Sequence, residues 1–250
     1  MDDPAPVAIV TGGAKRVGRV VCGRLAERGY RVAVHANTSL DAAEELASQL
    51  RKNETDAIAL SADLTDEAAA RAMLDSAAHK FGRLDLLVNS AAIWRPKPLR
   101  EVRASDLREY FDVNAVATFV CAQHAGLIMA DQPDGGSIVN FGDAAAERPQ
   151  AGYAAYHPSK GAIPTMTRSL AVELAAINPR VRVNAVLPGP VLVSDDEPEE
   201  RQQEVTRGVL LATTGHADHL ASAVLMLASN QFITGVCVPV EGGRRLGGGW

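Results

Sequence analysis

The sequence is short of cysteine and of positive charge, and each shortage excludes a class of protein. Only 3 of its 250 residues are cysteine. Cys22, Cys121 and Cys237 fit no metal-ligand spacing, and their odd number argues against a disulfide framework, so we expect buried thiols and no metal site. The formal net charge of −5 indicates neither a nucleic-acid partner nor an anionic membrane surface.

Long apolar runs are also absent. No run approaches the roughly 20 residues that span a bilayer. The N-terminal sequence MDDPAPVAIV is acidic and enters a predicted strand at once, unlike a signal peptide. These features predict a soluble, cytoplasmic protein. A chain with 47% hydrophobic and 22% charged residues suits one globular domain that covers residues 1–250.

Short apolar runs alternate with helix-length amphipathic segments, which is typical of a parallel sheet covered by helices on both faces. The predicted strands are 7–10, 31–35, 58–60, 84–88, 137–141, 181–187 and 236–240. The predicted helices are 19–28, 40–52, 66–81 with Thr65 as its N-cap, 104–129, one from Tyr156 onward, and 217–229. We expect a solvated loop over the acidic run 195–200. The pattern predicts a single-domain, Rossmann-like, doubly wound α/β fold of about seven strands.

Tyr156 and Lys160 stand one helical turn apart, and Asp143 precedes the tyrosine by thirteen residues. Positions i and i+4 share a helix face about 5–6 Å apart at Cβ. A nearby cation favours the ionised form of an acid, so we expect Lys160 to lower the pKa of Tyr156 toward neutrality, where a phenol can exchange protons. Asp143 is expected at a strand tip facing the same space. Most tyrosine–lysine pairs with this spacing are ordinary surface residues, so the interpretation depends on the other motifs.

The turn after the first predicted strand, TGGAKRVG at residues 11–18, predicts a nucleotide site. A strand, a glycine turn and a helix place backbone N–H groups and a positive helix end at one point, which suits a pyrophosphate. Gly12 and Gly18 allow tight turning and close approach of the phosphates. Arg16 stands where the commonest form of the motif has glycine.

The end of the second predicted strand favours NADP(H) over NAD(H). Residues 35–39 read HANTS and include no carboxylate, which would repel a 2′-phosphate. Lys15 or Arg16 would add positive charge nearby. The alternative is that residues 35–39 only cap the next helix, with Ser39 at the N-cap.

With these segments in place, the chain from residue 7 to 246 resembles the short-chain dehydrogenase/reductase family. The resemblance rests on residues 11–18, 63–64, 89–92, 114, 156–160, 187–189, 233–235 and 241–243. It implies that Tyr156 is the proton donor, that Lys160 lowers the pKa of the tyrosine and holds the nicotinamide ribose, and that Asn114 supports a water leading to the lysine. It also implies that Asp63 contacts adenine and that Pro188 and Gly189 line the nicotinamide.

The turn, the second strand end and the resemblance together define the candidate site. Its catalytic residues are Asp143, Tyr156, Lys160 and Asn114. Its cofactor residues are Gly12, Lys15, Arg16, Val17, Gly18, His35, Asn37, Thr38, Ser39, Asp63, Leu64, Asn89, Ser90, Ala91, Tyr156, Lys160, Pro188, Gly189 and Val191. Its substrate residues are Arg16, Ala92, Trp94, Asp143 and Tyr156.

Three departures from the commonest family pattern resemble the pteridine reductases. Asp143 replaces a serine, Arg16 replaces the second motif glycine, and residues 89–92 read NSAA in place of NNAG, with Trp94 shortly after. The resemblance implies that Arg16 reaches both the cofactor phosphate and the pterin. It also implies that Trp94 stacks over the pterin and that Asp143 partners Tyr156 in protonating a ring nitrogen.

The chemistry of these residues agrees with that branch. A ketone needs one neutral hydroxyl donor, whereas a pterin presents several N–H donors and an imine, and a carboxylate can accept from the former and share a proton with a phenol. An indole supplies stacking area. Two simpler interpretations stay open: Trp94 as an exposed loop aromatic or dimer contact, and Arg16 as a residue that only neutralises cofactor phosphate.

We therefore predict an NADPH-dependent reductase of a pteridine such as dihydrobiopterin, dihydromonapterin or dihydrofolate. One alternative is a carbonyl reductase of the same fold, such as a 3-oxoacyl-carrier-protein reductase or a sugar-alcohol dehydrogenase. Another is a non-catalytic NADP-sensing regulator. The resemblance further implies a homotetramer and a substrate lid around residues 190–215, with Val191 or Leu192 in contact with substrate.

Overall fold

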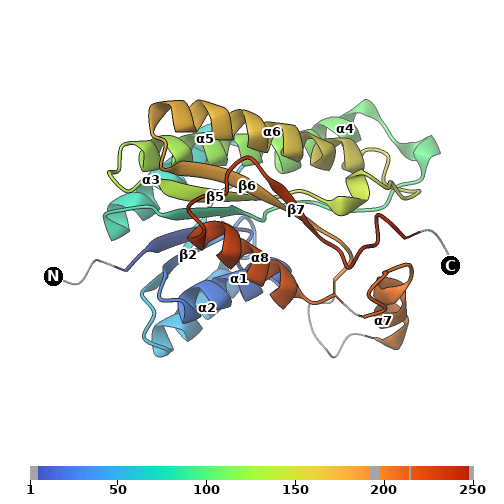
Figure 1. The fold of residues 1–250 in the computed structure, drawn as a ribbon, viewed down its shortest axis with the longest axis horizontal. Coiled ribbons are helices and arrows are strands. Elements are labelled where there is room, and N and C mark those ends of the chain that lie inside the picture. Colours follow the sequence, from blue (N-terminus) through green and yellow to red (C-terminus); the bar gives the residue numbers. More distant parts are fainter. Residues whose placement is uncertain (1–4, 192–197, 214, 248–250) are drawn as a thin grey trace.

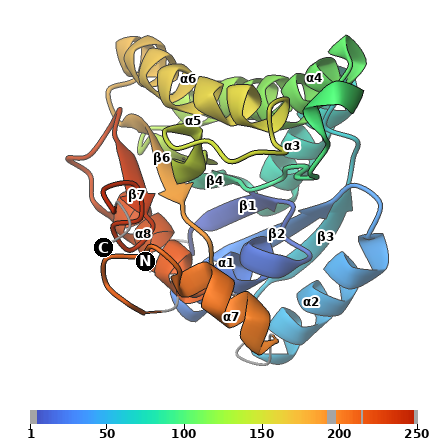
Figure 2. The same ribbon diagram turned by 90° about the vertical axis from the view of Figure 1, so that its right-hand side faces the viewer.

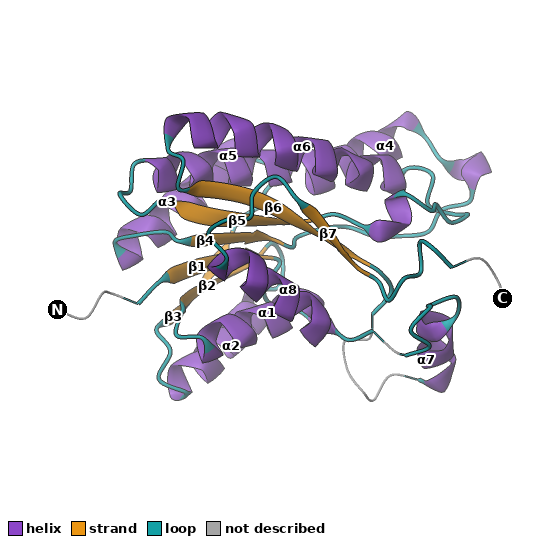
Figure 3. Ribbon diagram, viewed as in Figure 1, coloured by secondary structure: helices purple, strands orange, loops and turns teal. Residues whose placement is uncertain are grey.

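The computed structural model describes residues 5–191, 198–213 and 215–247. Their strands form one parallel sheet in the order β3-β2-β1-β4-β5-β6-β7 (Figure 3). The strands are β1 (Val7–Thr11), β2 (Arg31–Ala36), β3 (Ala57–Ser61), β4 (Leu86–Asn89), β5 (Gly136–Phe141), β6 (Val181–Pro188) and β7 (Cys237–Val240). The strand order reverses between β1 and β4, and ligands bind beyond the carboxyl ends of strands at such a point. The predicted fold class and strand number are confirmed.

Helices cover both faces of the sheet (Figure 1). On one face lie α1 (Arg16–Glu27), α2 (Leu40–Lys52) and α8 (Ala217–Ser229). On the other lie α3 (Glu67–Phe81), α4 (Ala104–Phe111), α5 (Ala117–Ala130) and α6 (Tyr156–Ile177). A separate helix, α7 (Glu199–Thr206), lies beside the carboxyl edge of the sheet, the side that Figure 2 turns toward the reader. The site described below opens on that side.

The central strand β1 shows why the sheet has two cores. All five of its residues are buried, as expected of a parallel strand covered on both faces. Val7 and Ile9 pack into the cluster with α3 and α5, whereas Ala8 and Val10 pack into the cluster with α1 and α2. Alternate residues of a strand point to opposite faces, so one apolar run supplies both cores.

The helical run Ala104–Ala130 is long and apolar enough to cross a membrane by length and composition, and more than half of its most apolar window is buried. Its buried side packs against α3, α6 and the sheet. Gly126 marks the closest approach, because an added Cβ there would lie 2.3 Å from the Leu174 side chain on α6. These contacts are those of a core helix in a globular domain.

Four local predictions were wrong. Helix α1 begins at Arg16, within the predicted turn of residues 11–18 and three residues before its predicted start. Asp66, rather than Thr65, caps α3 by accepting from the Ala68 and Ala69 amides. The predicted acidic loop is helix α7 from Glu199 onward, while residues 195–197 lie outside the described part of the chain. Cys22 and Cys121 are buried as expected, but Cys237 on the edge strand is only half-buried.

Candidate active site

Two cavities lie side by side at the carboxyl edge of the sheet. The smaller has a volume of about 370 Å³ and is bounded by the glycine turn, residues 90–94, and the ends of β5 and β6. The larger has a volume of about 880 Å³ and extends outward from α6 to the C-terminal segment. Both are lined by Arg16, Trp94, Asp143, Tyr156, Gly189 and Val191. Four of the five predicted substrate residues therefore lie where the two cavities meet, and the fifth, Ala92, lines only the smaller cavity.

Tyr156 and Asp143 form the central contact of this junction. The Tyr156 hydroxyl donates to Asp143 Oδ2 at 2.6 Å, and Asp143 Oδ1 accepts from the Ala145 amide at 2.7 Å. Burial and the Asp143 carboxylate raise the pKa of Tyr156 well above its ordinary value. The expected lowering of that pKa by Lys160 is therefore wrong for this arrangement, in which the phenol keeps its proton.

Lys160 is buried, one helical turn after Tyr156 on α6. Its Nζ donates to the Phe141 carbonyl at the end of β5, at 2.8 Å. Burial lowers the pKa of Lys160 to about 8, so a modest change in its surroundings changes its charge near neutral pH. Helix α6 begins at Tyr156, which places Pro158 in the first turn, where a missing N–H costs nothing. The one-turn spacing of Tyr156 and Lys160 is thus kept by a regular helix.

Asn114 joins three segments around the site. It lies in a π-helical turn, Asp112–Val116, between α4 and α5, and such turns occur frequently at functional sites. Its side chain accepts from the Ile93 amide at 2.9 Å and donates to the Ile93 carbonyl and to Ser159 Oγ, each at 3.1 Å. These bonds hold the loop after β4 against α6. The predicted contact with a water stays a prediction.

The glycine turn is pressed against the loop after β4. Gly12 has a φ of +64°, and an added Cβ would lie 2.9 Å from Ala91 Cα. Gly18 packs α1 onto the turn so closely that a Cβ would lie 2.3 Å from the Gly12 carbonyl oxygen. Thr11 Oγ1 ties the two loops together by accepting from the Ser90 and Ala91 amides at 3.1 and 3.2 Å. Only glycine fits at either position, as a close-packed phosphate-binding turn requires.

Arg16 has a left-handed backbone conformation, which glycine adopts readily. Its φ is +51°, in the left-handed region that a residue with a Cβ rarely adopts. Backbone strain of this kind clusters at functional sites. The guanidinium lines both cavities and has no hydrogen-bond or ion-pair partner within the described ranges. The fold therefore tolerates strain to place this side chain at the junction.

The end of β2 differs from the prediction in one residue. His35 is buried: its Nδ1 accepts from the Gly12 amide at 3.2 Å, and its Nε2 contacts the Ala62 carbonyl at 3.0 Å. It therefore supports the glycine turn from inside instead of facing the cofactor. Lys15 Nζ donates to Ser39 Oγ at 2.7 Å, so Ser39 occupies the N-cap position of α2 without a side-chain cap bond. The ammonium thus lies at the end of β2, where a 2′-phosphate would be recognised.

The other predicted cofactor residues lie in three environments. Val17, Ser90, Ala91, Ala92 and Pro188 line the smaller cavity. Asn37 and Thr38 are exposed beyond β2. Asn89 is buried and donates to Asn140 Oδ1 and the Thr118 carbonyl, and Leu64 belongs to the core. Asp63 accepts from the Thr65 amide and hydroxyl, which lower its pKa and stabilise the turn. Asn89 and Leu64 line neither cavity, and their predicted contact with the cofactor stays a prediction.

Known proteins of one family resemble this chain over almost its whole length. A family model described as enoyl-(acyl carrier protein) reductase matches residues 12–245. The chain belongs to the short-chain dehydrogenase/reductase family. It is 35% identical to a protein named as a ketoacyl reductase of the granaticin polyketide synthase of Streptomyces violaceoruber, with 97% of each chain covered. It is 34% identical to pteridine reductase 1 of Leishmania tarentolae, again with 97% of each covered.

A solved structure supports the same assignment for the fold of this chain. A blue fluorescent protein from a metagenomic library, solved in complex with NADPH, matches it with a TM-score of 0.85 and 34% identity. The match covers 96% of this chain and 98% of the other. The full length of the domain is therefore shared with a solved structure.

Two aromatic side chains at the site are absent from the predicted site residues. Tyr153 stacks on Trp94 with ring centroids 5.2 Å apart and planes 6° apart. His157 lines the larger cavity, and its Nε2 accepts from the Gln150 amide at 3.2 Å. Tyr153 precedes Tyr156 by three residues in an irregular segment, so no helical spacing could have indicated it.

The residues of the smaller cavity fit a dinucleotide with an added phosphate. The glycine turn opens directly into α1, whose first N–H groups suit a pyrophosphate. Lys15 and Arg16 add positive charge on that side, and residues 35–39 contain no carboxylate. Lys160 and Tyr156 border the same cavity at its far end, beside Pro188 and Gly189.

Proposed function

We propose that this short-chain reductase uses NADP(H) and reduces a pteridine. The observation that carries the proposal is the 2.6 Å hydrogen bond from Tyr156 to Asp143 at the junction of the two cavities. A carboxylate at that point accepts N–H groups of a heterocycle and shares the tyrosine proton, which a ketone does not require. The relative from Leishmania tarentolae, a pteridine reductase by name, supports this choice.

The cofactor would occupy the smaller cavity, held by the glycine turn, Arg16 and Lys160. Bound NADPH supplies a hydride for an imine carbon of the pterin. Tyr156, whose raised pKa keeps it protonated, holds the proton that the adjacent ring nitrogen needs. Asp143 accepts the phenolic O–H in the free protein. With a pterin bound it would accept a ring N–H instead, which leaves the hydroxyl to donate to the ring nitrogen. Lys160, which donates to the Phe141 carbonyl and lines the smaller cavity, would hold the nicotinamide ribose.

The walls of the junction suit a flat heterocycle. The stacked pair Trp94–Tyr153 presents an aromatic wall, and the 45% exposed indole leaves surface for a ligand. The unpartnered guanidinium of Arg16 faces both cavities, which suits a residue that contacts cofactor phosphate and substrate together. Val191 lines both cavities as well, while Leu192, the alternative substrate contact, lies outside the described residues.

The test is NADPH oxidation with dihydrobiopterin and dihydrofolate set against an acetoacetyl thioester. We expect wild type to turn over a pterin. Asp143→Ser should reduce pterin turnover by about 10²–10⁴-fold, the usual contribution of a positioned proton-transfer group, and should preserve or improve thioester reduction. Asp143→Asn is the matched control of equal size, because it keeps the hydrogen bond to the Ala145 amide and loses the charge. Turnover of the thioester alone by wild type would overturn the proposal.

A carbonyl reductase is the second candidate. The relative from Streptomyces violaceoruber is named as a ketoacyl reductase, and the 3-oxoacyl-carrier-protein reductase of Staphylococcus aureus is 32% identical to this chain. This candidate predicts that thioester turnover exceeds pterin turnover in wild type and does not depend on the Asp143 charge.

We further propose a cytoplasmic, single-domain homotetramer with a substrate lid at residues 190–215. Apolar side chains remain exposed on α5 and α6, including Phe119, Leu127, Val172 and Ile177. Exposed apolar surface of this kind marks sites of association. Light scattering behind size-exclusion chromatography should give four times the chain mass, and a monomer mass would rule the tetramer out.

A further inference from the structure

The larger cavity continues well beyond the catalytic junction. Its volume of about 880 Å³ lies toward the upper end of the 300–1,000 Å³ typical of small-molecule sites. A bicyclic ring beside Tyr156 would occupy only the inner end. The remaining space needs an explanation, and its lining residues supply one.

Three segments far apart in the sequence build the outer wall. They are residues 148–150, 207–210 and 241–247. Arg148 Nη1 donates to the carbonyls of Arg244 and Gly247, at 2.8 Å for the former. The Leu211 amide donates to the Gly242 carbonyl at 3.2 Å, which joins the segment after α7 to the C-terminal turn. The outer wall is therefore a cross-linked structure of this chain.

The charge of the cavity is opposite to that of the whole protein. The net charge of the chain is −5. Among the described residues that line the larger cavity, the cations are Arg16, Arg148, Arg207, Arg244 and Arg245, and the carboxylates are only Asp143 and Glu241. A concave surface of one sign concentrates ligands of the other sign. The cavity is suited to an anion.

The arginines of the outer wall differ in the hydrogen-bond and ion-pair partners that their guanidinium groups already have. Arg245 pairs with Glu147 at 3.3 Å and lies 3.9 Å from Glu241, so its charge is largely compensated. Arg148 uses one nitrogen to hold the C-terminal turn. The side chain of half-buried Arg244 has no hydrogen-bond or ion-pair partner within residues 5–191, 198–213 and 215–247. Arg244 is thus held in place by its backbone with its guanidinium uncommitted.

We propose that this outer wall is a binding subsite for an anionic tail on the substrate, with Arg244 as its principal contact. Guanidinium groups bind carboxylates in a bidentate manner that fixes direction as well as charge. This inference rests on the proposed function. The substrate class is a pterin conjugated to a carboxylate-bearing tail, as in dihydrofolate, and the enzyme prefers it to an unconjugated pterin. A phosphate-bearing tail shares the recognition chemistry and is separated by the test.

The test measures the tail apart from the ring. Calorimetry on the protein loaded with NADP⁺ uses two probes: p-aminobenzoylglutamate, which is the tail of dihydrofolate without its pterin, and pantetheine 4′-phosphate. The variants are Arg244→Ala and Arg244→Lys. Arg28→Ala is the matched control for loss of one charge, because Arg28 is exposed at the end of α1 and lines neither cavity. The ratio of kcat/KM for dihydrofolate to that for dihydrobiopterin is measured in parallel.

We expect p-aminobenzoylglutamate to bind wild type and Arg28→Ala equally, and to lose about tenfold or more in affinity in Arg244→Ala, the usual effect of removing a charged hydrogen-bond partner. Arg244→Lys should restore part of the affinity. The kcat/KM ratio should fall by a similar factor in Arg244→Ala.

Each other outcome separates the subsite from the reaction. Arg244-dependent binding of the tail without turnover of either pterin would support the subsite and overturn the pterin reaction. Turnover of both pterins with a ratio that Arg244→Ala leaves unchanged would overturn the subsite alone. Arg244-dependent binding of pantetheine 4′-phosphate, with no binding of p-aminobenzoylglutamate, would overturn the carboxylate assignment in favour of a phosphate tail.

Discussion

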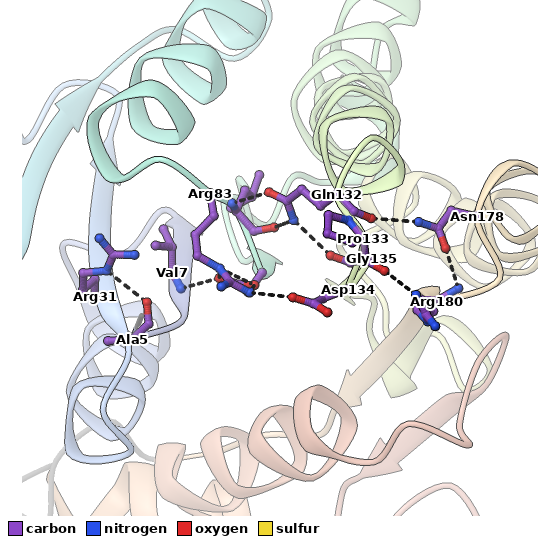
Figure 4. Close-up of polar contacts among 12 residues, drawn as sticks. Ala5, Val7, Arg31, Arg83, Gln132, Pro133, Asp134, Gly135, Asn178 and Arg180 are labelled. Atoms are coloured by element: carbon purple, nitrogen blue, oxygen red, sulfur yellow. Dashed lines mark hydrogen bonds and ion pairs between the residues drawn. The ribbon is translucent and has the colours of Figure 1, made fainter. Parts of the chain in front are cut away.

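Polar groups at the amino ends of the strands are paired by hydrogen bonds, whereas several of the described ones at the carboxyl ends are strained, unpaired or shifted in pKa. At the amino edge, drawn in Figure 4, side chains pair with neighbouring backbone and with each other. Asp85 accepts from the Val7 amide at 2.8 Å and from Arg83 at 2.6–3.0 Å. Gln132 accepts from the Leu84 amide and donates to the Leu84 and Gly135 carbonyls at 2.8–3.0 Å. This edge joins segments that are distant in the sequence.

At the carboxyl edge, several of the described residues have features that reduce stability: buried ionisable groups, a strained backbone and an unpaired polar atom. Tyr156 and Lys160 are buried with their pKa values displaced. Arg16 has a left-handed backbone. His157 Nδ1 is buried without a hydrogen-bond partner among the described residues. Perturbed groups of this kind concentrate at functional sites, so substitutions at the two edges should separate activity from stability.

The largest expected effect is the loss of activity in Tyr156→Phe. The variant removes the hydroxyl that donates to Asp143 and keeps the ring that packs edge-on against Tyr110. We expect kcat to fall by about 10²–10⁴-fold, as for other lost proton donors. The thermal midpoint should change little. Steady-state kinetics and calorimetry check both, and a variant that loses stability in parallel with activity would contradict the separation.

The reverse effect is expected at the amino edge for Gln132→Ala. The substitution removes three hydrogen bonds and leaves the amide and carbonyl of buried Leu84 without their partner. We expect a loss of about 2–3 kcal/mol in the free energy of unfolding, because unsatisfied buried backbone groups are costly, and an unchanged kcat. Chemical denaturation measures the loss. Gln49→Ala on the exposed face of α2 is the control and should cost less than about 0.5 kcal/mol.

The sequence predicts the carboxyl edge better than the amino edge, for a physical reason. Tyr156, Lys160, Asp143 and the glycine turn lie within short segments whose spacing or strand-end position carries the information. The contact of Gln132 with Leu84 joins residues 48 apart and depends on how two loops pass each other. No local pattern indicates such a pairing.

The same limit explains the errors at the site. The side chain of His35 was expected to face the cofactor because it ends β2, but a strand end does not determine which neighbour a ring will contact. The direction of the Tyr156 pKa depended on the distances from the phenol to Asp143 and from Lys160 to the Phe141 carbonyl. Helical spacing gives proximity on one face, but burial and the actual partner determine the sign.

A smaller effect, of opposite sign to that at Gln132, is expected for Lys160→Met. Burial lowers the pKa of Lys160 to about 8 from an ordinary value of 10.5, so folding works against its charge below pH 8. Methionine removes that cost but leaves the Phe141 carbonyl unpaired. We expect a net gain of about 1–2 kcal/mol in the free energy of unfolding at pH 7, together with loss of activity.

The stability difference between Lys160→Met and wild type should depend on pH. Between pH 8 and 10.5 the unfolded wild type holds a proton that the folded protein has lost, so wild-type stability rises with pH. The advantage of the variant should therefore be largest below pH 8 and shrink toward pH 10.5. Denaturant midpoints across that range measure it, and an advantage independent of pH would show that packing, not charge, is responsible.

The smallest effect expected is a reversal of the usual order of glycine and alanine at position 16. Because Arg16 has a φ of +51°, Arg16→Gly relieves left-handed strain that Arg16→Ala keeps. We expect the glycine variant to be more stable than the alanine variant by about 1 kcal/mol. At Arg19, inside the same helix and paired with Glu45, the order should be the ordinary one, with the alanine variant more stable than the glycine variant by about 1 kcal/mol.

Both variants at position 16 lose the guanidinium, so both should raise KM for NADPH and for the pterin alike. Equal stabilities of the two position-16 variants would mean that the turn relaxes once the arginine is gone. That result would contradict the assignment of the strain to the backbone of the turn.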